Sequence, residues 1–231
     1  METLPVDIFE LICKDMTAVE VTNIMMLSKQ LYAYRELLTP NKYLVAATLP
    51  SKEDKTLPVP EYCKKIGGFW NDVRVTDDIL ATLHDAHTVT LQHLVKVTDI
   101  GISKLGKVHS LNLCIMPNVT ERGISHLHDV HELELCKMDN VTTDAISKLG
   151  NGKMHTLKLW MMEQVDDDCM YHLGKSKIHT LILQNLSRVS NDGILMLGNI
   201  HTLYIWTMSQ ITLDRKFGNI QCLYINGRLL D

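Results

Sequence analysis

The second half of the chain repeats a short alternation of hydrophobic and polar positions. Residues 109–113 read His-Ser-Leu-Asn-Leu and residues 155–159 read His-Thr-Leu-Lys-Leu, so aliphatic side chains stand two positions apart. Because successive side chains of a strand point to opposite faces, this alternation predicts a short strand whose two aliphatic residues face a core. Similar segments begin at His87, His131, His179, His201 and Gln221, and successive segments start 20 to 24 residues apart.

A second pattern follows most of these strands and predicts a short helix. It opens on polar residues that can accept hydrogen bonds from the free N–H groups of a first helical turn. The openings are Thr98-Asp99, Thr120-Glu121, Thr142-Thr143, Asp166-Asp167 and Ser190-Asn191. Apolar pairs such as Ile102 with Leu105 come next and predict a buried helix face.

Small residues and glycines stand at regular places in and after these helices. Gly101, Gly123, Ala145, Cys169 and Gly193 lie inside the expected helices. There we expect each helix to approach its neighbour closely. Gly106, Gly150, Gly174 and Gly198 follow the expected helices. There we expect a left-handed backbone, because glycine commonly ends helices in that conformation.

One strand and one short helix cannot bury a core alone, but stacked copies can. The repeat therefore predicts an α/β solenoid with parallel strands on its concave face, with about seven units and a degenerate cap over residues 65–231. The pattern resembles the cysteine-containing type of leucine-rich repeat, and residues 97–105 (Val-Thr-Asp-Ile-Gly-Ile-Ser-Lys-Leu) carry its signature. The resemblance implies a horseshoe fold. Met or Leu stands where that family has Asn or Cys, so we expect packing to hold the turn.

The first forty residues carry a different pattern. Pro5 stands at an expected helix start, and apolar positions 8, 11 and 12 share one face. The segment resembles an F-box. The matching residues are Leu4, Pro5, Asp7, Ile8, Ile12, Met16, Glu20, Val21, Ile24, Leu27, Ser28, Lys29, Leu31 and Tyr32. We expect a small all-α F-box over residues 1–40 and a proline-rich linker over 41–64. The alternative is a helical cap that seals the end of the solenoid.

Composition and charge exclude several classes of protein. Of the 231 residues, 45% are hydrophobic and 22% are charged, a balance typical of globular proteins. A net charge of −4 offers no basic surface for nucleic acid. No apolar run approaches the roughly 20 residues that span a bilayer, and the acidic N-terminus predicts no secretory signal. We therefore expect a cytoplasmic or nuclear protein with reduced cysteines.

Candidate catalytic chemistry is sparse. The chain has none of the motifs typical of serine nucleophiles, phosphate-binding loops or zinc proteases, so we expect no catalytic activity, cofactor or metal. Six histidines at one repeat position should form a column at the ~4.8 Å spacing of adjacent strands. They are His87, His109, His131, His155, His179 and His201. A metal-binding or pH-sensing column is one interpretation. A strand-entry residue that caps backbone groups is favoured, because metal ligands must converge.

Aromatic residues mark a candidate binding surface on the concave face. Trp160 and Trp206 occupy the same slot two units apart, and Ile182 and Tyr204 fall in the adjacent column. Exposed aromatic side chains of this kind are typical anchors for protein binding. The alternative is that the tryptophans cover their neighbours or the C-terminal end.

The two resemblances together imply a function. An F-box followed by leucine-rich repeats is the domain order of substrate-recognition subunits in cullin–RING ubiquitin ligases. The F-box would bind a Skp-type adaptor, and through it a cullin, and the repeats would bind a protein substrate. The adaptor-binding residues implied are Leu4, Pro5, Ile8, Phe9, Ile12 and Leu31. The alternative is a leucine-rich-repeat scaffold for protein interactions without a role in ubiquitin transfer.

Overall fold

Each strand pattern of the sequence forms a strand in the computed structural model of the chain, which describes residues 66–70, 75–81, 83–84, 86–214 and 216–230. The expected F-box and linker lie outside these residues. The strands are β1 (Ile66–Trp70), β2 (Thr88–Gln92), β3 (Ser110–Cys114), β4 (Glu132–Cys136), β5 (Thr156–Trp160), β6 (Thr180–Gln184), β7 (Thr202–Trp206), β8 (Cys222–Ile225) and β9 (Arg228–Leu230).

Short helices alternate with the strands in the described part of the chain. They are α4 (Asp77–Ala81), α5 (Asp99–Ser103), α6 (Glu121–Ile124), α7 (Thr143–Leu149), α8 (Asp167–Gly174) and α9 (Asn191–Leu195). The polar openings predicted from the sequence cap five of these helices, where each side chain accepts a hydrogen bond from a first-turn N–H. The capping residues are Thr98, Thr120, Thr142, Asp166 and Ser190.

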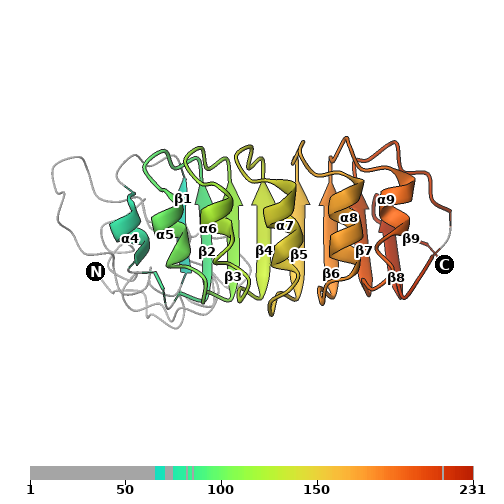
Figure 1. Cartoon of the computed structure of the whole chain (residues 1–231), viewed down its shortest axis with the longest axis horizontal. Coiled ribbons are helices and arrows are strands. Elements are labelled where there is room, and N and C mark those ends of the chain that lie inside the picture. The colour runs from blue at the N-terminus through green and yellow to red at the C-terminus, as the bar shows by residue number, and fades with distance from the viewer. Residues whose placement is uncertain (1–65, 71–74, 82, 85, 215, 231) are drawn as a thin grey trace, which may run out of the picture.

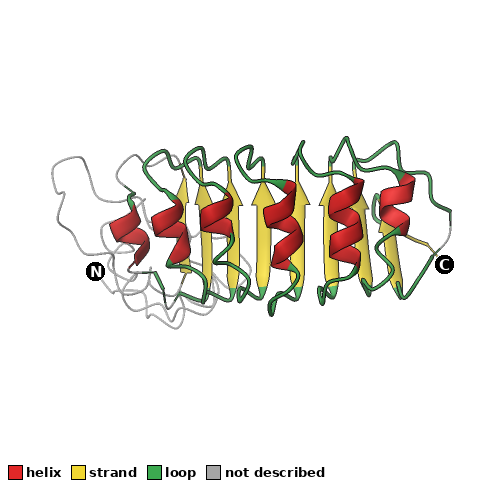
Figure 2. Cartoon of the chain, in the orientation of Figure 1, coloured by secondary structure: helices red, strands yellow, loops and turns green. Residues whose placement is uncertain are grey.

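The strands form one sheet in chain order, and the helices lie in a single layer over one of its faces (Figures 1 and 2). Strands β1 to β8 are parallel and in register, and β9 pairs antiparallel with β8. This confirms an α/β solenoid built from repeated strand–helix units. We call the face of the sheet opposite the helices the strand face.

The core lies between the sheet and the helices. In β3, for example, Leu111 and Leu113 are buried while Ser110, Asn112 and Cys114 are half-buried on the strand face. The Met or Leu residues that follow the strands are also buried, which agrees with a turn held by packing. No polar or charged residue is buried within the described ranges. The core is therefore apolar throughout, and it runs continuously from unit to unit.

The residue after each of the strands β2 to β8 adopts a left-handed backbone, with φ between 49° and 55°. These residues are His93, Ile115, Lys137, Met161, Asn185, Thr207 and Asn226. The conformation costs a residue other than glycine about 1–2 kcal/mol. This conformation directs the backbone N–H toward the next unit. The Ile115 N–H, for example, donates to the Cys136 carbonyl at 3.0 Å. That hydrogen bond offsets part of the cost.

The expectation of left-handed glycines at the helix ends is wrong. Gly150 has φ of −66°, and only Gly218 and Gly227 have positive φ among the described glycines. Close approach of the next unit explains Gly106, Gly150 and Gly174, whereas a Cβ atom at Gly198 would meet nothing within 4 Å. A Cβ atom added to Gly106 would lie 2.5 Å from the carbonyl oxygen of His126 in the next unit. Glycine is therefore needed there because the next unit passes so close.

A carboxylate at the start of one helix holds the cap of the next helix. The Asp99 carboxylate accepts hydrogen bonds from the N–H and the O–H of Thr120, each at 2.7 Å, and Thr120 caps α6. Asp77 holds Thr98 in the same way, as Asp167 holds Ser190. We call this paired contact the interunit clamp. Because hydrogen bonds to a charged group contribute about 1.5–3 kcal/mol, the clamp fixes neighbouring helices firmly.

The clamp explains the small residues inside the helices. A Cβ atom added to Gly123 would lie 2.7 Å from the Asp99 Oδ1 atom. Gly101 and Gly193 face the carboxylates of Asp77 and Asp167 in the same way. The expected close approach is therefore confirmed, and the group that approaches is a carboxylate of the preceding helix.

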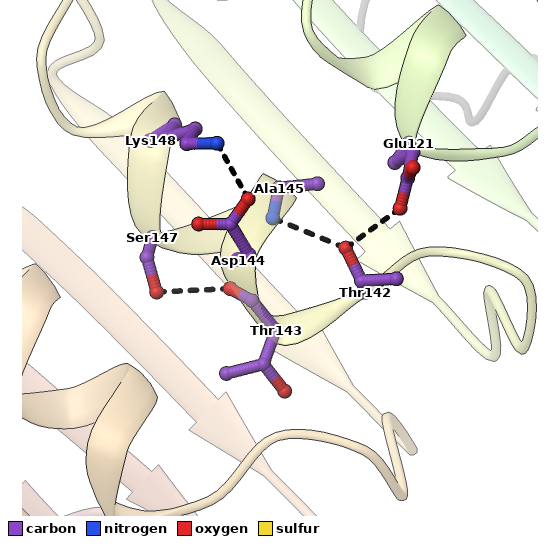
Figure 3. A network of polar contacts seen from close by, with 7 residues as sticks. All are labelled: Glu121, Thr142, Thr143, Asp144, Ala145, Ser147 and Lys148. Atoms are coloured by element: carbon purple, nitrogen blue, oxygen red, sulfur yellow. Dashed lines mark hydrogen bonds and ion pairs between the residues drawn. The ribbon is translucent and has the colours of Figure 1, made fainter.

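Larger residues fill this slot where the preceding helix does not begin with aspartate. Ala145 follows a helix that begins with Glu121, whose longer side chain accepts the Thr142 O–H at 3.0 Å (Figure 3). Cys169 follows a helix that begins with Thr143, whose hydroxyl donates to a backbone carbonyl at 2.8 Å. Glycine is thus required only where an aspartate reaches across.

The C-terminal end closes with a hairpin that the sequence analysis did not anticipate. Asn226 and Gly227 form the turn between β8 and β9, with φ of 49° and 81°. An Asn-Gly pair is the strongest short signal for such a turn, because both positions require positive φ. The Asn226 side chain also accepts the Thr207 N–H at 2.8 Å, where no further parallel strand supplies a carbonyl.

Candidate functional site

The six repeat histidines form the expected column. Neighbouring imidazole rings stack with centroids 4.2 to 5.0 Å apart and planes within 30° of parallel. Their backbones join the units as well, since the His87 carbonyl accepts hydrogen bonds from the N–H groups of His109 and Ser110. The column therefore has a structural role at strand entry.

Most rings of the column have a neutral hydroxyl partner. The Nδ1 atom is hydrogen-bonded to the Oγ1 atom of the threonine that follows, at 3.0 to 3.3 Å. These pairs are His87–Thr88, His155–Thr156, His179–Thr180 and His201–Thr202. His131 differs because Glu132 follows it, and its Nδ1 atom is buried without a hydrogen-bond partner.

Stacking disfavours charge in the column. Burial lowers the pKa of His179, and the neighbouring His201 and His155 lower it further. The pKa of His109 is also lowered by burial and by His131 and His87, against an opposing effect of Glu132. A protonated ring would lose hydration and meet further imidazoles on both sides. The neutral form is therefore the one that the fold favours at these two positions.

The strand face carries columns of side chains that change character along the solenoid. Its middle column runs Thr90, Asn112, Glu134, Lys158, Ile182, Tyr204 and Tyr224. The next column runs Gln92, Cys114, Cys136, Trp160, Gln184 and Trp206. Small and polar side chains thus give way to charged and then to aromatic and aliphatic ones toward the C-terminal end.

The four residues predicted to bind a partner lie together on this face. Trp160 and Trp206 both pair with Gln184 in register, which places them about 10 Å apart on alternate strands. Ile182 and Tyr204 are direct neighbours in the middle column. None of the four belongs to the buried core. We call these four residues the aromatic patch.

Two polar side chains border the patch. Lys158 and Glu134 form an ion pair at 3.0 Å between neighbouring strands, with both side chains half-buried. The Lys158 Nζ atom also lies 5.7 Å from the centroid of the Trp160 ring, within the range of a cation–π interaction. The pair holds Trp160 from one side and gives the patch a charged margin.

The C-terminal hairpin supports the other end of the patch. A Cβ atom added to Gly227 would lie 3.1 Å from the Trp206 ring, so this ring packs on the turn. Tyr204 stacks on Tyr224 with ring centroids 4.6 Å apart. Trp206 still keeps 37% of its surface exposed. Trp206 therefore covers part of the C-terminal end, as the alternative interpretation proposed. The rest of its side chain faces solvent.

Two thiols in the described part of the chain are held in the protonated form. Burial and a hydrogen bond with Cys114 raise the pKa of Cys136 to about 12. Burial raises the pKa of Cys169 to about 12 as well. Because a thiolate is the nucleophilic form of cysteine, neither residue is activated for covalent chemistry.

A polar groove lies on the helix side, between α7 and α8. Its volume is about 570 Å³, and Thr143, Ser147, Asp166 and His172 are among its lining residues. The groove lies where the interunit clamp is missing, because Thr143 takes the place of the aspartate. Its charged groups form no ligand cluster. The only group of three potential metal ligands found in the described ranges is His109, His131 and Glu132.

The chain matches no family model and no curated protein. No described helix has the length and hydrophobicity that a membrane span requires. The predicted adaptor-binding residues lie outside the described ranges. Any function of residues 65–231 must therefore be inferred from the geometry of the strand face.

Acidification should destabilise the solenoid through His179. The pKa of this residue is lower in the folded chain than the ordinary value of about 6.5, so the unfolded chain takes up the proton first. Stability is full above pH ~6.5 and is lost as the pH falls through the folded pKa. Thermal unfolding with a chelator present should show a lower midpoint at about pH 5.5 than at about pH 7.5. A His179→Gln variant should show a smaller drop, and equal drops would contradict the assignment.

Proposed function

We propose that the chain is the substrate-recognition subunit of a cullin–RING ubiquitin ligase, with an F-box over residues 1–40 and leucine-rich repeats over 65–231. The F-box binds a Skp-type adaptor, and through it a cullin, and the repeats bind a protein substrate. The observation that carries the proposal is the F-box-like sequence ahead of the repeat. The chain itself performs no chemistry. It raises the effective concentration of a substrate lysine near a charged ubiquitin-conjugating enzyme.

The contacts made by residues 97–105 support the assignment to the leucine-rich repeats. Val97, Ile102 and Leu105 are fully buried. Between them, Thr98 caps α5 and Asp99 reaches into the next unit. Every distinctive position of the nine-residue signature thus has a packing or hydrogen-bonding role between units. These roles, repeated in phase along the chain, support the proposed assignment.

The aromatic patch supports a protein as the bound partner. Trp206 and Tyr204 offer large apolar surfaces that are held in place by the hairpin and by Tyr224. Rigid aromatic groups lose little conformational freedom on binding, so they anchor protein interfaces effectively. The Lys158–Glu134 pair at the margin supplies polar contacts for the rim of such an interface. The expected substrate segment presents an apolar side chain to the patch and polar groups around it.

Adaptor binding tests the F-box directly. The full chain should co-purify with a Skp-type adaptor at micromolar concentrations, and replacing Leu4 and Pro5 by Ala should weaken that binding at least tenfold. The reason is that an apolar surface on forty residues is too large for them to bury alone. Trp206→Ala is the control, because it alters only the strand face and should keep full adaptor binding. If the wild-type chain shows no binding, the ligase assignment fails and the plain scaffold replaces it.

Substrate capture tests the aromatic patch. Trp160→Ala and Trp206→Ala should each weaken capture of the substrate, since truncating such an anchor costs ~2 kcal/mol or more. Ile100→Ala is the matched control, because Ile100 is an apolar residue exposed on the helix side. The measurement is affinity capture of each full-length variant followed by mass spectrometry. A substrate should be retained by the control and lost by both tryptophan variants. Identical captured sets from all variants would place the site elsewhere.

A further inference from the structure

One unit of the histidine column leaves a buried ring nitrogen unsatisfied. Where the other paired rings meet a threonine hydroxyl, His131 is followed by Glu132, and its buried Nδ1 atom has no partner. A buried polar atom without a hydrogen bond is costly and rare. The carboxylate of Glu132, in turn, has no hydrogen bond or ion pair within the described ranges. The fold thus leaves one nitrogen of the His131 ring and the carboxylate of the next residue unsatisfied.

A third group completes the cluster from the preceding unit. Ligand atoms of His109, His131 and Glu132 all lie within 4.8 Å of one another. The rings of His109 and His131 stack with centroids 4.5 Å apart, and Glu132 pairs with Ser110 across strands β3 and β4. His131 is half-buried while His109 and Glu132 are exposed, so solvent reaches the cluster. The three ligands therefore come from two neighbouring units.

We propose that His109, His131 and Glu132 form a binding site for a divalent transition-metal ion of the zinc class. Two imidazole nitrogens and one carboxylate oxygen are a ligand set that zinc accepts, with water in the fourth position. Bond lengths of about 2.0–2.2 Å in a tetrahedron require ligand atoms about 3.4 Å apart. The ligand atoms now lie within 4.8 Å of one another, so the two rings must turn out of their parallel stack to converge on an ion.

The carboxylate distinguishes this site from the rest of the column. A row of stacked histidines alone offers ligands along a line, and the threonine hydroxyls carry no charge to balance a cation. Glu132 adds a third ligand atom close to both rings, and it also carries a negative charge. A bound ion would tie strand β3 to strand β4 through groups of both units. The inference concerns residues 109–132 alone and does not depend on the proposed role in ubiquitin transfer.

Calorimetric titration of the full-length chain with Zn²⁺, after removal of metal by a chelator, tests the proposal. The wild-type chain should bind one ion at this site, and its thermal midpoint should rise with Zn²⁺. Glu132→Thr should weaken that binding at least tenfold and abolish the rise. This variant installs the threonine that follows the histidine in four other units, so it should fold normally.

Two control variants separate this site from other ligands. His201→Gln removes a ring of the same column that has no carboxylate beside it. Cys136→Ser removes a thiol on the strand face. Both should bind Zn²⁺ as the wild-type chain does. The proposal is overturned if the wild-type chain binds no Zn²⁺ at micromolar concentrations. It is equally overturned if Glu132→Thr binds as tightly as the wild-type chain, or if His201→Gln loses as much affinity as Glu132→Thr.

Discussion

The carboxylate that reaches from one helix to the cap of the next ties together three of the five neighbouring pairs of described helices. Asp99 holds both polar groups of Thr120, and Gly123 leaves the space that the Asp99 side chain occupies. Aspartate, capping residue and glycine belong to two successive units, so neither unit can form the contact alone. The contact sets the distance between helices at the same interval that the parallel strands set on the other side of the core.

This spacing is what gives the two candidate sites their geometry. Strands in register bring the histidines to stacking distance, so His109 and His131 stack with the Glu132 carboxylate close to both. The same register aligns Trp160 and Trp206 on either side of Gln184. Both surfaces are therefore consequences of a repeat length that keeps every strand in phase. A change of unit length would have to be absorbed in the helix or its loops, as in the longer units that contain α7 and α8.

The sequence pattern alone predicted strands β2 to β8, the helix caps, the histidine column and the register of the tryptophans, but not β1 or β9. These features follow from periodicity, which is a local property of the chain. The left-handed residues such as Ile115 were not predicted, because a hydrogen bond to the next unit and not the residue type determines them. The convergence of Glu132 on two histidines was missed for the same reason, as it joins side chains from different units. The C-terminal turn was predictable from Asn226 and Gly227, and the adaptor-binding residues lie outside the described ranges.

A double-mutant cycle between Asp99 and Gly123 tests the central claim most directly. Gly123→Ala alone should lower the free energy of unfolding by about 1–3 kcal/mol, because the new Cβ atom meets the Asp99 carboxylate. In Asp99→Ala the carboxylate is gone, so adding Gly123→Ala should cost clearly less than it does in the wild-type chain. Gly198→Ala is the control, since a Cβ atom there meets nothing within 4 Å, and its effect should simply add to that of Asp99→Ala. Additive effects of Asp99→Ala and Gly123→Ala in denaturant unfolding would contradict the account.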